Sequence, residues 1–167
     1  MSDISTHYGI QIAEENTSIF DVPAQAIVNP VNLVGVAGKG LALEFKLRYP
    51  EAFEYYRAQC KSGAFQVGNI LAYYIPNTDY YERGETELIL NFPTKIHWRN
   101  ESDYASIEEG LNALVKCTNS EKLYSIAIPP LGCGLGGLDR NKVKDMILQL
   151  YCPYVYKHLK FLYLLQF

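Results

Sequence analysis

Residues 125–139 read SIAIPPLGCGLGGLD, an apolar run followed by four glycines within six residues and then by an aspartate. The run 125–131 predicts a short buried strand, and Asp139 is suited to cap a helix that continues to residue 150. Glycines let a ligand approach the backbone, and a helix N-terminus adds partial positive charge. A tight turn alone needs one or two glycines, so we expect a diphosphate-binding loop here.

Strand-like and helix-like patterns alternate over the rest of the chain. Apolar runs and amphipathic stripes predict strands at 9–13, 24–32, 69–75, 87–92 and 158–167, and helices at 38–61 and 102–118. Pro50 must break the first of these helices or begin a second one at its first turn. This alternation predicts an α/β fold with a largely parallel sheet that binds its ligand at the carboxyl ends of the strands.

Composition and charge narrow the classes of function. The chain has 167 residues, of which 49% are hydrophobic, and its formal net charge is −3. These values predict one globular domain over 1–167, and they disfavour disorder and extended wrapping of duplex DNA. Four cysteines without CxxC spacing and three histidines do not suggest a zinc site. With no secretory signal and no long apolar stretch, we expect a monomeric, cytoplasmic protein with free thiols, no metal and no membrane contact.

A second glycine-rich segment, NPVNLVGVAGKG at 29–40, follows a predicted buried strand. It does not fit the P-loop pattern, because Leu33 stands where glycine is needed and Gly40 where serine or threonine is needed. This loop can still bind a ribose-phosphate unit, and Lys39 is either near a phosphate of that unit or solvated. The carboxamides of Asn29 and Asn32 can bind sugar hydroxyls or form hydrogen bonds to their own turn.

The third segment, NFPTKIHWR at 91–99, also follows a predicted strand. Lys95 is predicted to act as an electrostatic clamp on a ligand or, if desolvated, as a nucleophile. Trp98, the single tryptophan, is either a core residue or a lid that stacks on a base, and His97 is expected to be structural rather than catalytic. Because loops at strand ends meet in space, the three segments are predicted to line one cleft.

Together the segments NPVNLVGVAGKGLALEFK, NFPTKIHWR and SIAIPPLGCGLGGLD resemble the macrodomain family in order and spacing. The NFPTKIHWR segment narrows the resemblance to one group of this family, the DarG-type macrodomains, which are DNA ADP-ribosyl glycohydrolase antitoxins. The resemblance extends from residue 10 to residue 163. It implies a three-layer α/β/α fold with a mixed central sheet, which binds ADP-ribose and needs no other cofactor.

The resemblance also implies roles for single residues. Lys95 falls at the position of the catalytic lysine, and Asn29 is expected to assist it near the distal ribose. Ser18 and Ile19 are implied at the adenine. The residues implied at the distal ribose are Asn32, Val34, Gly35, Val36, Gly38, Lys39 and Gly40, and those at the diphosphate are Cys133, Gly134, Leu135, Gly136 and Gly137. Thr94, Pro130, Leu131 and Gly132 are also expected to bind the ligand.

Two positions depart from the wider family. Ser18 stands where many macrodomains have an aspartate that selects adenine, so adenine recognition is expected to rely on the Ile19 N–H group. Gly136 stands where related eukaryotic glycohydrolases have a catalytic aspartate. This absence favours the DarG-type group over enzymes that act on ADP-ribosyl-glutamate.

The activity implied by the resemblance is metal-independent removal of ADP-ribose from thymidine in single-stranded DNA, which undoes the action of a DarT-like toxin. ADP-ribosylated single-stranded DNA and such a toxin are therefore the expected partners. Two alternatives are a non-catalytic reader of ADP-ribose, in which Lys95 is only a clamp, and a phosphatase of ADP-ribose 1″-phosphate.

Overall fold

The computed structural model describes residues 9–153 and 158–167, and its centre is a six-stranded sheet in the order β1-β6-β5-β2-β4-β3. β3 pairs antiparallel with β4, and the other neighbours are parallel. The strands are β1 (Gly9–Ile12), β2 (Ala26–Asn32), β3 (Leu71–Tyr74), β4 (Leu88–Lys95), β5 (Ser125–Ile128) and β6 (Phe161–Leu164). The sheet is therefore mixed, as predicted.

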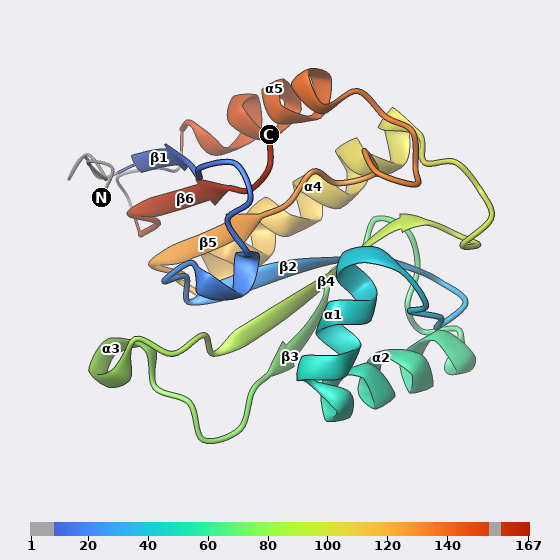
Figure 1. Ribbon diagram of the computed structural model, residues 1–167, viewed down its shortest axis with the longest axis horizontal. Helices are drawn as coiled ribbons and strands as arrows, with labels where there is room; N and C mark the ends of the chain where they lie inside the picture. The colour runs from blue at the N-terminus through green and yellow to red at the C-terminus, as the bar shows by residue number, and fades with distance from the viewer. Residues whose placement is uncertain (1–8, 154–157) are drawn as a thin grey trace.

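Helices cover both faces of this sheet (Figure 1). The longer ones are α1 (Gly40–Arg48), α2 (Pro50–Ser62), α4 (Tyr104–Ser120) and α5 (Arg140–Tyr151). α4 and α5 lie on one face and α1 and α2 on the other, which confirms the three-layer α/β/α class. None of the helices in the described part of the chain is long and apolar enough to cross a membrane. The first eight residues, which bear on the expected absence of a secretory signal, lie outside the described residues.

The two largest hydrophobic cores, one on each face of the sheet, follow from the period of two along each central strand. Val28 of β2 and Leu90 of β4 point toward α4 and α5, and both are fully buried. Their neighbours Ile27 and Ile89 point to the opposite face, where they pack with Phe45 of α1. Because both faces are covered, these strands are almost continuously apolar, as expected of buried parallel strands.

The predicted end of the fourth strand is wrong. We expected strand 87–92 followed by a loop, but β4 continues to Lys95. A proline usually interrupts a central strand because it has no N–H group. β3 pairs with β4 only as far as Asn91, so one side of β4 is free beyond that point and Pro93 is tolerated there. Lys95 is therefore held by a strand rather than by a loop.

Local signals account for the remaining elements. Pro50 ends the first predicted helix and begins a second at its first turn, which confirms the predicted break. Two short helices were missed: η1 (Ile19–Asp21) and α3 (Tyr80–Arg83). α3 lies in a polar tyrosine-rich segment that we took as irregular, although Asp79 caps it by accepting a hydrogen bond from the Glu82 N–H group.

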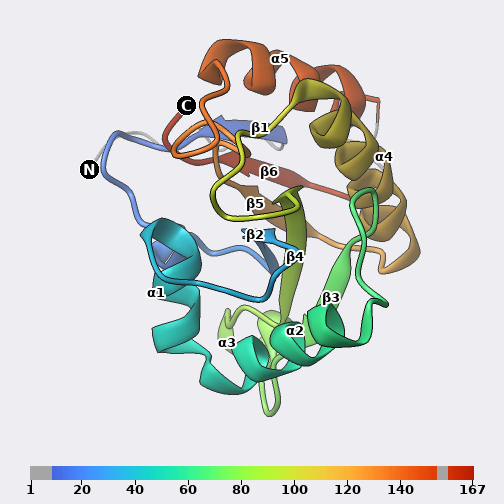
Figure 2. The same ribbon diagram turned by 90° about the vertical axis from the view of Figure 1, so that its right-hand side faces the viewer.

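The three segments singled out from the sequence gather at one end of the sheet. They are the loop 33–39 after β2, the segment 96–103 after β4 and the loop 129–138 after β5. Figure 2 looks onto this end, where the carboxyl ends of the parallel strands face the viewer. The fold thus places the glycine-rich loops and Lys95 in one region, as the topology of the sheet predicts.

Replacing Gly110 by alanine should destabilise the fold. Gly110 lies in α4 over the ring of Phe92, and a Cβ atom there would overlap this ring, which is fully buried. Overpacking of this kind costs about 1–3 kcal/mol, which exceeds the gain of about 1 kcal/mol in helix propensity. Urea unfolding of Gly110→Ala should show a lower free energy of unfolding. Gly134→Ala, where a Cβ meets open space, is the control, and a stabilised Gly110→Ala protein would refute this packing.

Candidate functional site

Asn32 organises the loop that follows β2. Its Oδ1 accepts hydrogen bonds from the N–H groups of Val34, Gly35 and Val36, at 3.1, 3.1 and 3.3 Å. Its Nδ2 donates to the Val36 carbonyl at 2.8 Å, and the Tyr56 hydroxyl donates to the Asn32 carbonyl at 2.6 Å. The reading in which Asn32 binds its own turn is therefore correct. Its contact with a ribose stays a prediction. The second hydrogen of Nδ2 is not used within the loop, and it is the group that would donate to a ribose hydroxyl.

Removal of the Asn32 side chain should loosen this loop. Asn32→Ala leaves three backbone N–H groups without their acceptor, which costs about 1–3 kcal/mol. We expect a lower free energy of unfolding and faster amide hydrogen exchange at Val34, Gly35 and Val36. Unchanged exchange at these three amides would show that the loop does not depend on Asn32. Ser62→Ala, on the exposed end of α2, is a suitable control.

A β-bulge sets the position of Lys95. Val31 of β2 pairs with Pro93 of β4, but the next residue, Asn32, pairs with Lys95, so Thr94 is inserted between the two pairs. Bulges re-aim the side chains that follow them and are common beside active sites. Thr94 is buried, and its hydroxyl donates to the Val31 carbonyl at 3.4 Å. Lys95 is half-buried and forms no ion pair within residues 9–153 and 158–167.

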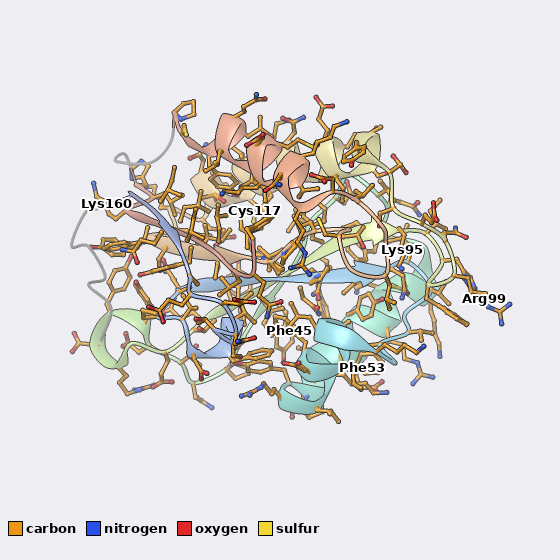
Figure 3. The ribbon with its side chains drawn as sticks, turned by 45° about the horizontal axis from the view of Figure 1, so that its top comes forward. Phe45, Phe53, Lys95, Arg99, Cys117 and Lys160 are labelled. Carbon is orange, nitrogen blue, oxygen red and sulfur yellow. The ribbon has the colours of Figure 1, made fainter. Side chains whose placement is uncertain are left out.

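The segment after β4 contacts both glycine-rich loops. The Leu33 N–H group donates to the Ile96 carbonyl at 2.9 Å, and the Ser102 N–H group donates to the Gly136 carbonyl at 3.0 Å. We call residues 96–102 the crest strap. Figure 3 shows Lys95 at the end of β4 and Arg99 projecting outward at the same end of the molecule. The prediction that the three segments meet in space is confirmed by these contacts.

The loop after β5 presents free backbone donors. Its own turns use the N–H groups of Cys133, Gly137 and Leu138. The consecutive N–H groups of Gly134, Leu135 and Gly136 have no acceptor in the described part of the chain. A run of unpaired N–H groups forms an anion-binding concavity. This arrangement suits the predicted diphosphate.

The cap of α5 changes which backbone groups we expect to bind the diphosphate. Asp139 accepts a hydrogen bond from the Lys142 N–H group at 2.9 Å, so the predicted cap is confirmed. Its carboxylate also places a negative charge at the helix N-terminus, which opposes anion binding by the helix end. The loop N–H groups, rather than the helix, are therefore the better diphosphate donors.

Cys133 lies in the same loop and stays uncharged near neutral pH. Burial raises the pKa of its thiol to about 11, and the nearby Arg140 only partly opposes this. A thiolate would repel a diphosphate, so this environment keeps the loop compatible with an anion. All four cysteines are free thiols, as predicted.

Asn29 lies apart from Lys95. It pairs with Asn91, three residues before the Asn32–Lys95 pair, which corresponds to about 10 Å along the strand. Its Nδ2 donates to the Asn91 Oδ1 at 3.2 Å, and its own Oδ1 is buried without a hydrogen-bond partner among the described residues. Both asparagines line a pocket whose other walls come from β4, the loop after β2, α1 and α2. The register therefore separates the backbone positions of the two predicted catalytic residues along the sheet.

The remaining predicted residues surround α1. Lys39 is exposed and precedes α1 without a side-chain cap, so the first N–H groups of this helix are available beside its charge. Ser18 caps η1 by accepting a hydrogen bond from the Phe20 N–H group at 3.2 Å, and Ile19 is buried. The Phe20 ring packs against Phe45 of α1. Ser18 and Ile19 thus lie beside α1, and their role at an adenine stays a prediction.

Sequence reasoning missed three residues that shape this region. Asn91 holds Asn29, the Tyr56 hydroxyl braces Asn32, and Ser102 lies under the glycine loop with its Oγ buried and without a partner in the described chain. Asn91 alone carried a signal, a polar residue within an otherwise apolar strand. The other two act through contacts that depend on tertiary structure.

The comparisons with known proteins agree with this geometry. The Macro domain family matches residues 28–147. The DNA ADP-ribosyl glycohydrolase of Thermus aquaticus is 42% identical over 130 residues, which are 78% of this chain and 35% of that protein. The chain therefore spans about a third of the length of this curated relative.

Solved structures are similar over nearly the whole chain. The macrodomain of Mycobacterium tuberculosis DarG has a TM-score of 0.83 and 35% identity, over 92% of this chain and 97% of that one. Thermosipho africanus DarTG in complex with ADP-ribose has a TM-score of 0.82 and 31% identity, over 94% of this chain and 41% of that one.

Proposed function

The chain belongs to the macrodomain family, and on that premise we propose that it binds ADP-ribose and hydrolyses the bond that joins it to a base of single-stranded DNA. Family membership confirms the resemblance drawn from the three sequence segments. The substrate is proposed from similarity to relatives whose names state that they act on DNA. A DarT-like toxin is the proposed source of the modified strand, since one similar structure is of a DarTG protein.

Binding of ADP-ribose is supported by the three loops. The unpaired N–H groups of Gly134, Leu135 and Gly136 suit the diphosphate. The loop held by Asn32 leads into the N-terminus of α1, which Lys39 directly precedes. This set offers backbone donors and one cation to a dianionic ligand. Within the described ranges, no three His, Cys, Asp or Glu side chains gather in a way that could hold a metal ion.

The single observation that carries the hydrolysis proposal is the position of Lys95. The bulge at Thr94 directs it to the end of β4, where it pairs with Asn32 and directly precedes the crest strap, which contacts both glycine-rich loops. When the bond at C1″ breaks, the base leaves with the bonding electrons and positive charge develops on the ribose. An ammonium at Lys95 stabilises the departing base and can supply its proton, while water adds to C1″.

The test is release of ADP-ribose by the wild-type chain from a single-stranded oligonucleotide that carries it on thymidine. The proposal expects free ADP-ribose and unmodified oligonucleotide in equal amounts. Parallel reactions use ADP-ribose 1″-phosphate and an ADP-ribosylated protein. Calorimetry with free ADP-ribose measures binding separately.

The alternatives give different results in this test. A reader binds ADP-ribose in calorimetry but releases none from any substrate. A phosphatase releases inorganic phosphate from the 1″-phosphate and leaves the oligonucleotide modified. Either result contradicts the proposed hydrolysis, and failure to bind ADP-ribose contradicts the site itself.

A further inference from the structure

Three planar side chains form a short stack on the crest strap. The rings of His97 and Trp98 have centroids 5.2 Å apart with an angle of 30° between their planes. The Arg99 guanidinium lies 4.6 Å from the centroid of the Trp98 ring. Trp98 is still 46% exposed with both contacts in place. Part of the Trp98 side chain therefore stays accessible to a further planar group.

The strap holds this stack in place before any ligand binds. Its first residue, Ile96, is fixed to Leu33, and its last, Ser102, is fixed to Gly136. Between them, the Arg99 N–H group donates to Nδ1 of His97 at 3.1 Å. Groups ordered in advance lose little conformational entropy on binding. The stack is therefore a preorganised surface.

Exposed apolar side chains continue this surface onto both glycine-rich loops. Val34 and Val36 stand on the loop after β2, Ile96 begins the strap, and Leu135 stands on the loop after β5 at 72% exposure. Grouped exposed apolar residues on a soluble protein indicate a binding surface. Ile96 directly follows Lys95 in the sequence, and Val34, Val36 and Leu135 lie on the two loops that the strap contacts.

We propose that the crest strap is a nucleobase platform, on which His97, Trp98 and Arg99 bind the unpaired bases that flank the ADP-ribosylated base. This inference rests on the proposed function and names how that site recognises its strand. Trp98 is three residues from Lys95, so a strand lying on the strap passes beside the lysine. His97, Trp98 and Arg99 are distinct from the residues predicted to bind ADP-ribose, which include Val34, Val36 and Leu135 of the adjoining loops.

The chemistry of the stack favours a single DNA strand over a duplex or a protein. Every unpaired base offers a π-face to an aromatic ring and to a guanidinium, whereas the bases of a duplex are already stacked. Arg99 also supplies a cation for the adjacent phosphate. The net charge of −3 restricts favourable contact to a few nucleotides around this point.

The test uses the fluorescence of Trp98, which is the single tryptophan of the chain. Excitation at the red edge of the absorption band avoids the tyrosines. Wild-type protein is titrated with a short unmodified oligothymidylate, with a duplex containing the same strand, and with ADP-ribose. We expect strong quenching by the single strand, weaker quenching at equal concentration of duplex, and a response to the single strand that persists when ADP-ribose is bound.

Two substitutions test whether Trp98, whose fluorescence reports strand binding, also contributes to binding of the modified substrate. Trp98→Ala should weaken oligothymidylate binding, followed by anisotropy of a labelled strand, by at least about fivefold, the low end of the effect of removing a stacking ring. It should raise KM for the modified oligonucleotide with little change in kcat, and leave ADP-ribose binding unchanged. Tyr81→Ala removes a ring that is even more exposed, on α3 at the opposite end of the sheet, and should change none of these quantities (Figure 1).

Failure of this inference is distinguishable from failure of the proposed function. Release from the modified oligonucleotide without quenching by the single strand, and with an unchanged KM in Trp98→Ala, overturns the platform and leaves the hydrolase intact. Quenching by the single strand without any release supports the platform and overturns the hydrolase. Quenching by ADP-ribose alone assigns Trp98 to the adenine and overturns the platform.

Discussion

Lys95→Ala should abolish release of ADP-ribose from modified DNA while the protein still binds ADP-ribose. Positioned proton donors and charge-stabilising groups contribute about 100- to 10,000-fold to rates, so a loss of at least about 100-fold is expected. Binding should persist because the predicted diphosphate donors are backbone N–H groups of the loop after β5. Single-turnover release measures the first quantity and calorimetry the second.

Two further measurements distinguish the roles of Lys95. Lys95→Arg keeps a cation but has no amine that can attack, so activity in this variant indicates a clamp or proton donor. Attack by the amine at C1″ would release the base and form a glycosylamine, whose ribose ring opens to an imine between Nζ and C1″ that borohydride reduces to a stable adduct of protein and ADP-ribose. Lys116→Ala, on the exposed face of α4, is the matched control. Full activity in Lys95→Ala would remove the lysine from the mechanism.

Gly136→Ala should have the second largest effect, a loss of ADP-ribose affinity. A Cβ atom at this position would overlap the Gly132 carbonyl oxygen and the Ser102 Oγ, and would lie 2.9 Å from the Gly132 carbonyl carbon. A backbone atom cannot move away without deforming the loop. Strain of about 1–3 kcal/mol corresponds to a loss of about one to two orders of magnitude in affinity. Calorimetry with ADP-ribose measures the loss.

Ser102 provides the control for Gly136. Ser102→Gly removes one of the two atoms that the new methyl group would meet, so the double variant should recover part of the affinity. Circular dichroism and urea unfolding must show that Gly136→Ala remains folded. Wild-type affinity in a folded Gly136→Ala protein would show that this loop does not contact the ligand.

The arrangement of strands and helices was predictable because the central strands are buried on both faces. Their apolar runs at β2, β4 and β5, and the prolines and glycines between them, specify alternating elements and hence a parallel sheet. The end of β4 was not predictable in this way. Pro93 argues against a strand, and only the short pairing of β3 makes it acceptable.

The site was predictable at the level of segments rather than atoms. The three segments could be placed together because loops after parallel strands share one edge of the sheet. Whether Asn32 binds a ribose or its own turn depends on where the N–H groups of Val34 and Val36 lie. Their positions are a property of the folded loop. The distance from Asn29 to Lys95 depends on the register of β2 with β4, and the bulge at Thr94 changes that register.

The most direct test of the account is the ratio of two initial rates for the wild-type chain. One is release of ADP-ribose from a thymidine-modified single-stranded oligonucleotide, and the other is release from an ADP-ribosylated protein at equal substrate concentration. A lysine at the end of β4, an exposed Trp98 on the adjoining strap and a glycine at position 136 together predict that the DNA rate exceeds the protein rate. A protein rate equal to or above the DNA rate would contradict the account.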